Sequence, residues 1–137
     1  MNKMFKIIIF LFYLVLLSCE DQETLPEFGT ILVNINFVGS FPDSGEVIMT
    51  LNTVFPITGP PAGFVRGIND ADLDNGVYTH SFIDLPFRTY ERILISYWPE
   101  YYEVAGDNYF TIGDYEDIIN LSQEEANINI EIDAIFE

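Results

Sequence analysis

The sequence predicts an all-β fold, a single antiparallel β-sandwich of about seven strands. Three observations favour it. Hydrophobic residues alternate with polar ones over several short stretches, as they do in strands that are buried on one face only. Glycine- and proline-containing turns separate these stretches, and no helical period follows the first 18 residues. Short strands joined by turns, without helices, are typical of two packed sheets.

The first two predicted strands lie between residues 29 and 51. Four hydrophobic residues after Gly29 fall on one strand face: Ile31, Val33, Ile35 and Phe37. The residues between them are mostly polar. Turn residues fill positions 39–45, and a second alternation follows at Val47, Met49 and Leu51. Residues 56–76 are rich in proline and glycine and show no clear period, which predicts a long loop, with one short strand as the alternative.

The second half of the chain contains the remaining predicted strands. Tyr78, His80 and Phe82 share one face of a strand over residues 77–85, and a turn over residues 86–89 follows. The later strands are expected within residues 90–98, 104–112, 118–121 and 126–136. The resulting domain spans residues 29–137.

The first 19 residues have the composition of a secretory leader. Lys3 and Lys6 precede an apolar run over residues 7–17, which is shorter than the roughly 20 residues that span a bilayer as a helix. Leu16-Leu17-Ser18-Cys19 resembles the lipobox of bacterial lipoproteins, which implies cleavage after residue 18 and lipids on Cys19. The alternative is an ordinary signal peptide with an incidental cysteine. Cys19 is the only cysteine in the chain, so no intramolecular disulfide can form.

Residues 19–28 form an expected acidic tether. Glu20-Asp21-Gln22-Glu23 resembles the signal that sends lipoproteins of Bacteroidota to the outer face of the outer membrane. This resemblance implies a domain that faces the cell exterior. The alternatives are a plain solvated tether and a periplasmic location.

The charge of the predicted mature chain excludes several classes of partner. Residues 19–137 contain three arginines, no lysine and all 22 acidic residues, so their formal net charge is −19. Such a field repels phosphate backbones and anionic lipid head groups. We therefore expect no nucleic-acid binding, and membrane attachment only through the lipid anchor.

Two short motifs resemble those of small Bacteroidota lipoproteins. The first is Gly29-Thr30-Ile31 leading to Phe37-x-Gly39-x-x-Pro42-Asp43, and the second is Tyr78-x-x-x-Phe82-x-x-Leu85-Pro86-x-x-x-Tyr90. The resemblance implies a transthyretin-like, carboxypeptidase-regulatory-like β-sandwich over residues 29–137, and no catalytic residue. The family turn reads Leu-Pro-Pro-Gly-x-Tyr, whereas Phe87 and Arg88 stand at its Pro-Gly positions here. Tyr90 is the candidate for a buried ring whose hydroxyl bonds upstream backbone at a sandwich corner.

An acidic segment and an aromatic segment are the candidate binding sites. Asp70, Asp72 and Asp74 resemble a calcium loop, but Asn75 and Ser81 stand where its glycine and bidentate glutamate belong. Three remote carboxylates are candidates to complete such a site: Asp114, Glu116 and Asp117. The alternative is a solvated acidic loop.

The aromatic segment is Tyr97-Trp98-Pro99-Glu100-Tyr101-Tyr102. Exposed rings beside polar groups bind sugars by stacking on the apolar faces of the sugar. The candidate glycan-binding residues are therefore Trp98, Tyr101 and Tyr102. The alternative is that Tyr97 and one neighbour close the end of the core. A further polar surface is expected from four amides on the outer faces of the first and last strands: Asn34, Asn36, Asn127 and Asn129.

The sequence does not favour an enzyme. His80 is the sole histidine and stands in the middle of a predicted strand, and no phosphate loop, nucleophile elbow or paired-histidine metal motif is found. The sequence therefore predicts a non-enzymatic, lipid-anchored module that contacts envelope proteins or glycans. The alternatives are a glycan-binding accessory protein and a calcium-stabilised adhesion module, and no other cofactor is expected.

Overall fold

The computed structural model describes residues 24–137. The predicted signal peptide over residues 1–18, Cys19 and the acidic residues 20–23 lie outside the described residues. Within residues 24–137, no helix is both long and apolar enough to cross a bilayer.

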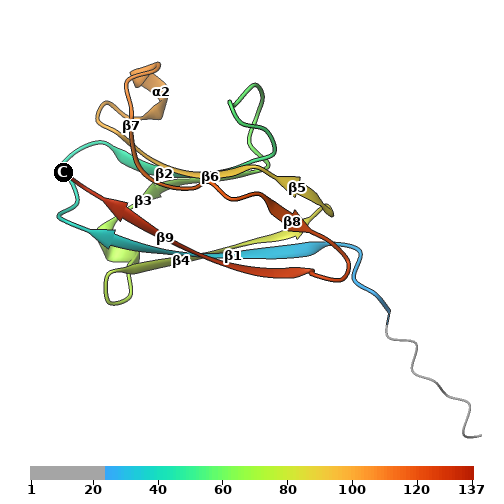
Figure 1. Ribbon diagram of the computed structural model, residues 1–137. Coiled ribbons are helices and arrows are strands. Elements are labelled where there is room, and N and C mark those ends of the chain that lie inside the picture. Colours follow the sequence, from blue (N-terminus) through green and yellow to red (C-terminus); the bar gives the residue numbers. More distant parts are fainter. Residues whose placement is uncertain (1–23) are drawn as a thin grey trace, which may run out of the picture.

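Two β-sheets lie face to face, and a short pair of strands closes one end of the space between them (Figure 1). One sheet has the strand order β4-β1-β9, the other has the order β3-β2-β6-β7, and the short pair is β5-β8. The strand bounds are β1 (Gly29–Val38), β2 (Glu46–Asn52), β3 (Gly63–Ile68), β4 (Val77–Leu85), β5 (Arg88–Tyr90), β6 (Arg92–Trp98), β7 (Phe110–Tyr115), β8 (Ile119–Leu121) and β9 (Asn127–Ile135). The helical segments are the 3₁₀ turn η1 (Asp70–Asp72) and the short helix α2 (Tyr102–Ala105). The predicted all-β sandwich is therefore confirmed.

One strand pair departs from the antiparallel prediction. β1 pairs with β9 in parallel, in a register that places Ile31, Val33 and Ile35 opposite Ile128, Ile130 and Ile132. This register puts the apolar residues of both strands on the core face. A period of two determines which face of a strand is buried, but it says nothing of strand direction.

One alternative was correct, and two predicted bounds were wrong. Residues 56–76 contain β3 and η1, so the alternative of one short strand within this loop is the correct one. The strand expected within residues 104–112 runs from Phe110 to Tyr115, and α2 occupies part of the expected range. β5 begins at Arg88, inside the predicted turn over residues 86–89.

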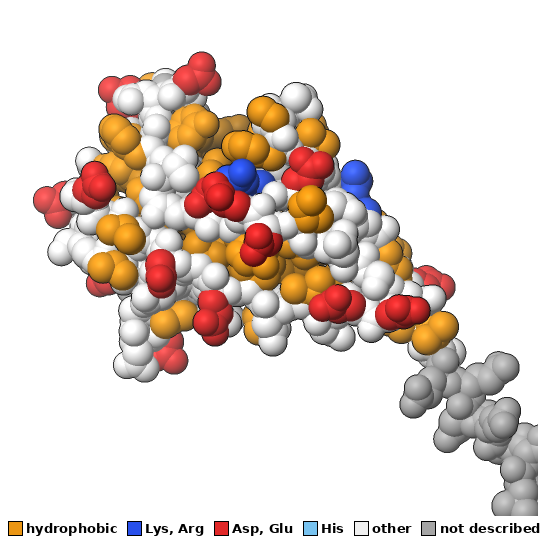
Figure 2. Space-filling view, in the orientation of Figure 1, with side chains coloured by type: hydrophobic (Ala, Val, Ile, Leu, Met, Phe, Trp, Pro, Cys, Tyr) orange, Lys and Arg blue, Asp and Glu red, His pale blue; other side chains and the backbone are white. Residues whose placement is uncertain are grey.

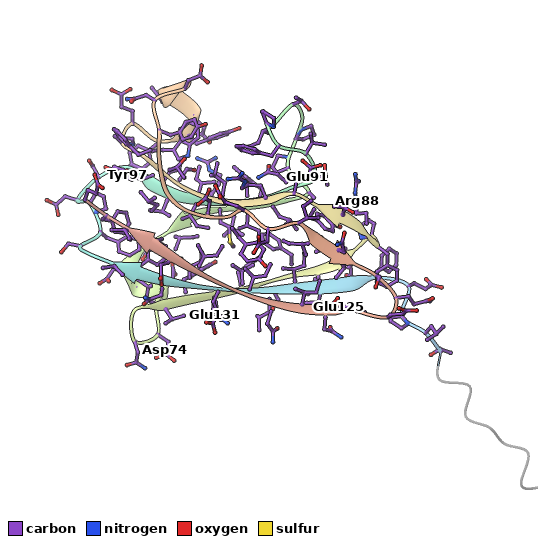
Figure 3. All side chains as sticks on the ribbon, in the orientation of Figure 1. Asp74, Arg88, Glu91, Tyr97, Glu125 and Glu131 are labelled. Atoms are coloured by element: carbon purple, nitrogen blue, oxygen red, sulfur yellow. The ribbon has the colours of Figure 1, made fainter. Side chains whose placement is uncertain are left out.

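The core consists of the inward-facing side chains of both sheets, which fill the space between them (Figure 3). The alternation predicted from the sequence places Ile31, Val33 and Ile35 of β1 in it, and each is fully buried. Val47, Met49 and Leu51 of β2 oppose them from the other sheet. Burying an aliphatic side chain of this size stabilises a fold by about 1.5–3 kcal/mol.

Tyr90 forms the predicted corner. Its side chain is fully buried, and its hydroxyl donates to the Pro86 carbonyl oxygen at 2.9 Å. Burial raises the pKa of Tyr90, and nearby Arg88 opposes that shift, so the hydroxyl keeps its proton at neutral pH. The Tyr90 hydrogen bond therefore forms with Phe87 and Arg88 in the preceding turn.

The chain enters and leaves the sandwich at different ends. Leu25 to Gly29 approach at the β5–β8 end, where Gly29 packs against Leu121. α2 and the C-terminus lie at the opposite end (Figure 1). The first described residues are therefore remote from α2.

Candidate functional site

Two loops rise from the outer face of the four-stranded sheet, which we define as the side chains of β2, β3, β6 and β7 that point away from the core. The proline loop (residues 53–62) follows β2, and the tyrosine loop (residues 99–109) follows β6 and includes α2. Figure 2 shows two prominences with a depression between them, in which apolar and charged side chains mix. Ile48 and Trp98 are on this face and are buried, with 1% and 9% exposed. The outer face is therefore partly covered, unlike an ordinary solvated sheet face.

Trp98 is the buried base of the tyrosine loop. Its indole N–H donates to Ser96 Oγ at 2.8 Å, and its ring stacks on Tyr109 with centroids 4.6 Å apart. Tyr102 packs edge-on against it at 5.0 Å. These two tyrosine rings therefore cover the indole that the sequence predicted as a stacking surface.

The other two predicted glycan-binding residues are exposed to solvent. Tyr101 is 52% exposed and Tyr102 is 45% exposed. Tyr101 has a φ of 61°, a conformation that favours glycine, and it still carries a large exposed ring. Tyr97 packs against the core instead, and its hydroxyl donates to the Ser44 carbonyl oxygen at 3.0 Å. Each of the two expectations for the aromatic segment therefore holds for part of it. Tyr97 closes the core, whereas Tyr101 and Tyr102 face solvent.

The tyrosine loop is fastened to the sheet by Glu46 and Arg66. Arg66 Nη2 and Nε donate to the two carboxylate oxygens of Glu46 at 2.7 and 3.2 Å, and the Tyr102 N–H donates to Glu46 Oε1 at 2.7 Å. The Arg66 guanidinium also lies 5.4 Å from the Tyr102 ring centroid and bonds Glu103 at 2.9 Å. The hydrogen bond from Arg66 holds the pKa of Glu46 below its usual value; burial opposes the shift, and the Tyr102 N–H adds to it.

The proline loop is fastened by the same kinds of contact. The Phe55 N–H donates to Glu91 Oε2 at 2.8 Å, and the Arg92 guanidinium lies 3.9 Å from the Phe55 ring centroid. Glu91 lies at the foot of this loop (Figure 3). Arg92 Nη1 bonds Asp114 at 2.7 Å and Glu116 at 3.0 Å. Arg92 therefore links the proline loop to β7.

Two buried polar atoms at the foot of the proline loop have no hydrogen-bond partner in the described part of the chain. They are Asn52 Oδ1 and Arg92 Nε, and their residues are cross-strand partners in the β2–β6 register. Asn52 is only 2% exposed. An unpaired buried polar group costs about 1–3 kcal/mol. Sequence analysis missed Asn52, because an asparagine at the end of a strand is unremarkable until its burial is known.

The three-stranded sheet has a polar outer face, as the four amides predicted. Asn36 Nδ2 donates to Asp133 at 3.0 Å, and Thr79 Oγ1 donates to Asn34 at 2.8 Å. Asn127 and Asn129 lie on the same face but oppose Thr30 and Leu32, so the four amides are staggered. The side chains of Asn34 and Asn36 hydrogen-bond partners on the neighbouring strands.

The acidic loop is held by its own hydrogen bonds. Asp72 Oδ2 accepts from the Asn69 backbone N–H at 3.0 Å and from Asn69 Nδ2 at 2.7 Å, which completes a capping box at η1. Asp74 accepts from Asn75. The remote candidates Asp114 and Glu116 bind Arg92 instead. Residues 24–137 contain no group of three or more His, Cys, Asp or Glu side chains arranged for a metal ion, so calcium binding stays a prediction.

His80 is packed between aromatic rings. It lies edge-on to Phe82 at 4.7 Å and parallel to Tyr78 at 6.4 Å. Burial lowers the pKa of His80, which favours the neutral ring at physiological pH. These contacts give His80 a packing role on the inner side of β4.

Comparisons with protein-family models, with curated proteins and with solved structures found no match.

Proposed function

We propose that this chain is a non-enzymatic binding module of the bacterial cell envelope, and that the outer face of the four-stranded sheet is its binding surface. One observation carries the proposal. Exposed apolar side chains gather on the two loops and on the strand beside them: Val54, Phe55, Ile57, Phe64, Tyr101, Tyr102, Val104 and Tyr109, each between 41% and 76% exposed. Apolar side chains gathered on one face of a soluble domain are typical of an interaction site.

The same proposal includes a lipid anchor on Cys19 and an outer-membrane location facing the cell exterior. The sandwich begins at Gly29, at the end opposite α2, so a lipid on Cys19 leaves the tyrosine loop directed away from the bilayer. The family we propose remains that of transthyretin-like Bacteroidota lipoproteins, and the Tyr90 corner supports it.

A test of the anchor is labelling with an alkyne analogue of palmitate in the native host. Wild type should incorporate the label and sediment with membranes, whereas Cys19→Ser should do neither. Because Cys19 is the only cysteine, the chain offers no other thiol to take the label. Equal labelling of the two proteins contradicts the anchor.

A glycan is the second candidate for the ligand class, and the two exposed rings favour it. Tyr101 and Tyr102 stand beside the charged groups of Glu46, Arg66 and Glu103. Rings that stack on a sugar and polar groups that bond its hydroxyls are the usual elements of such a site.

Site-specific photocrosslinking in intact cells tests the binding surface. A photoreactive phenylalanine analogue at Val104, 76% exposed on the tyrosine loop, should give a discrete adduct. The same analogue at Ser81, exposed on β4 of the other sheet, is the matched control and should give none. Adducts of equal yield from the two positions, or from Ser81 alone, contradict the assignment of the surface.

A further inference from the structure

A small cavity of about 180 Å³ lies between the proline loop and the end of β2. Its polar groups come from Asn52, Thr53 and Thr58, and its apolar wall includes Val54 and Ile57. None of the described residues that line it is charged. Pockets for drug-sized ligands have volumes of about 300–1,000 Å³, so this smaller cavity suits one small unit of a ligand.

The Asn52 side chain presents an acceptor that the described residues leave unpaired. Its Nδ2 donates to Thr50 Oγ1 at 2.9 Å and approaches the Thr50 carbonyl oxygen at 3.4 Å. A carbonyl oxygen only accepts, so the amide nitrogen must face Thr50. The amide oxygen therefore faces the other way, and it is buried without a partner in a residue that lines the cavity.

The neighbouring strand β6 contains a buried donor that also lacks a partner among the described residues. Arg92 is the cross-strand partner of Asn52, and its Nε is also buried without a partner among residues 24–137. Its Nη1 is engaged by Asp114 and Glu116, which fixes the guanidinium. Arg92 is not among the described residues that line the cavity, so Asn52 Oδ1 is the unpaired atom that belongs to a cavity residue. A hydroxyl is the simplest uncharged group that donates to a carbonyl oxygen.

We propose that the cavity between the proline loop and the end of β2 binds one residue of a neutral saccharide, whose hydroxyl donates to Asn52 Oδ1. The proposal rests on the binding role proposed for the outer face, and it names the ligand class.

Charge argues for a neutral sugar. Residues 19–137 carry a formal net charge of −19, which disfavours anionic sugars in the absence of a free cation. Arg92, the cross-strand partner of Asn52, already pairs with two carboxylates. A cationic sugar finds no carboxylate among the residues that line the cavity.

The test uses the full lipidated protein, labelled with ¹⁵N and purified in a zwitterionic detergent, because glucoside and maltoside detergents carry the candidate chemistry. The probes are the methyl pyranosides of glucose, galactose, mannose and N-acetylglucosamine, with methyl glucuronoside as the charged comparison. The readout is the side-chain amide signal of Asn52, identified by its loss in Asn52→Leu. At least one neutral glycoside should shift this signal with saturation at millimolar concentration.

Two variants decide whether the cavity is the site. Asn52→Leu removes the acceptor, and Thr58→Trp fills the cavity from an exposed loop position without touching the core. Each should weaken binding by about tenfold or more, measured by the ligand's own saturation-transfer signal. Ser81→Trp, on the other sheet, is the matched control and should bind as wild type does. If Asn52→Leu does not fold, Thr58→Trp alone decides.

Three results overturn the proposal. The first is that no neutral glycoside shifts the Asn52 signal, which assigns the cavity to water. The others are that Thr58→Trp binds the glycoside as well as wild type does, or that the glucuronoside binds as well as the neutral glycosides do. These failures are separate from failure of the proposed function. Crosslinking from Val104 reports the tyrosine loop, so an adduct there with no sugar at Asn52 retains the binding surface and removes only the saccharide.

Discussion

The tyrosine loop and the proline loop rise from the same sheet face and are fastened by matching contacts. In each, a carboxylate accepts a backbone N–H from the loop: Glu46 of β2 accepts from Tyr102, and Glu91, which directly precedes β6, accepts from Phe55. In each, an arginine lies over the ring of that same loop residue. The two loops differ in what lies beneath them.

Beneath the tyrosine loop the groups are paired and packed. Glu46 accepts from both Arg66 and Tyr102, and the Trp98 ring fills the space below. Beneath the proline loop, Asn52 Oδ1 and Arg92 Nε lack partners in the described chain and a cavity remains. Packing therefore holds the tyrosine loop in place, whereas buried polar atoms beneath the proline loop stay unpaired within the described residues.

The largest effect is expected from the ring beneath the tyrosine loop. Trp98→Ala removes the side chain on which Tyr102 and Tyr109 pack, and should lower the free energy of unfolding by about 3 kcal/mol. Urea denaturation followed by circular dichroism measures it. Val104→Ala, at the most exposed position of the same loop, should stay within about 0.5 kcal/mol of wild type. Equal losses of unfolding free energy in both variants contradict the role of Trp98 as the packed base of the tyrosine loop.

A paired substitution compares the two carboxylates. Glu46→Gln loses charge-assisted bonds to both Arg66 and Tyr102 and should lower stability by about 1.5 kcal/mol. Glu91→Gln weakens one bond to Phe55 and should cost less, about 0.5 kcal/mol. Trp98, the only tryptophan, reports the difference, because its emission should shift in Glu46→Gln and stay unchanged in Glu91→Gln. The opposite pattern contradicts the comparison.

Acid should release the tyrosine loop through the same carboxylate. Arg66 lowers the pKa of Glu46 from its ordinary 4.5, so the folded state favours the ionised form. This stabilisation is present above pH 4.5 and is lost as the pH falls through the lowered pKa. Trp98 emission recorded from neutral pH downward should change in that acidic range. Glu46→Gln should abolish this change, and its persistence in that variant assigns it to another acid.

Much of the fold follows from the sequence because a period of two specifies which side chains are buried. Ile31, Val33 and Ile35 alternate without interruption, and β1 lies as predicted. β3 was expected only as an alternative, one short strand within a long loop, because Gly63 and Gly67 break its alternation. The close approach of Gly63 to the Phe82 ring explains why a glycine is required there: an added Cβ would lie 2.4 Å from that ring.

Only those residues of the candidate site that are neighbours in the sequence were predicted. Tyr101 and Tyr102 stand in an aromatic run, which indicates exposed rings whatever the fold. The fastening of that run depends on Glu46 and Arg66, which are distant along the chain and are brought together by strand register. Asn52 depends on burial by a loop that has no periodicity of its own, so its unpaired oxygen could be found only from the structure.

A substitution at Tyr101 should change stability in the opposite direction, and it separates stability from binding within the tyrosine loop. Tyr101 holds a φ of 61°, which glycine adopts without strain, so Tyr101→Gly should raise the free energy of unfolding by about 1 kcal/mol. The same change removes a ring that is 52% exposed, so it should reduce the yield of the Val104 crosslink. Tyr101→Ala separates the two contributions, because it loses the ring and keeps the strain. Urea denaturation measures the first quantity, and crosslinking in intact cells measures the second. A glycine variant that is more stable and retains full crosslinking contradicts a binding role for this ring, whereas a less stable one shows that the ring packs more tightly than its exposure indicates.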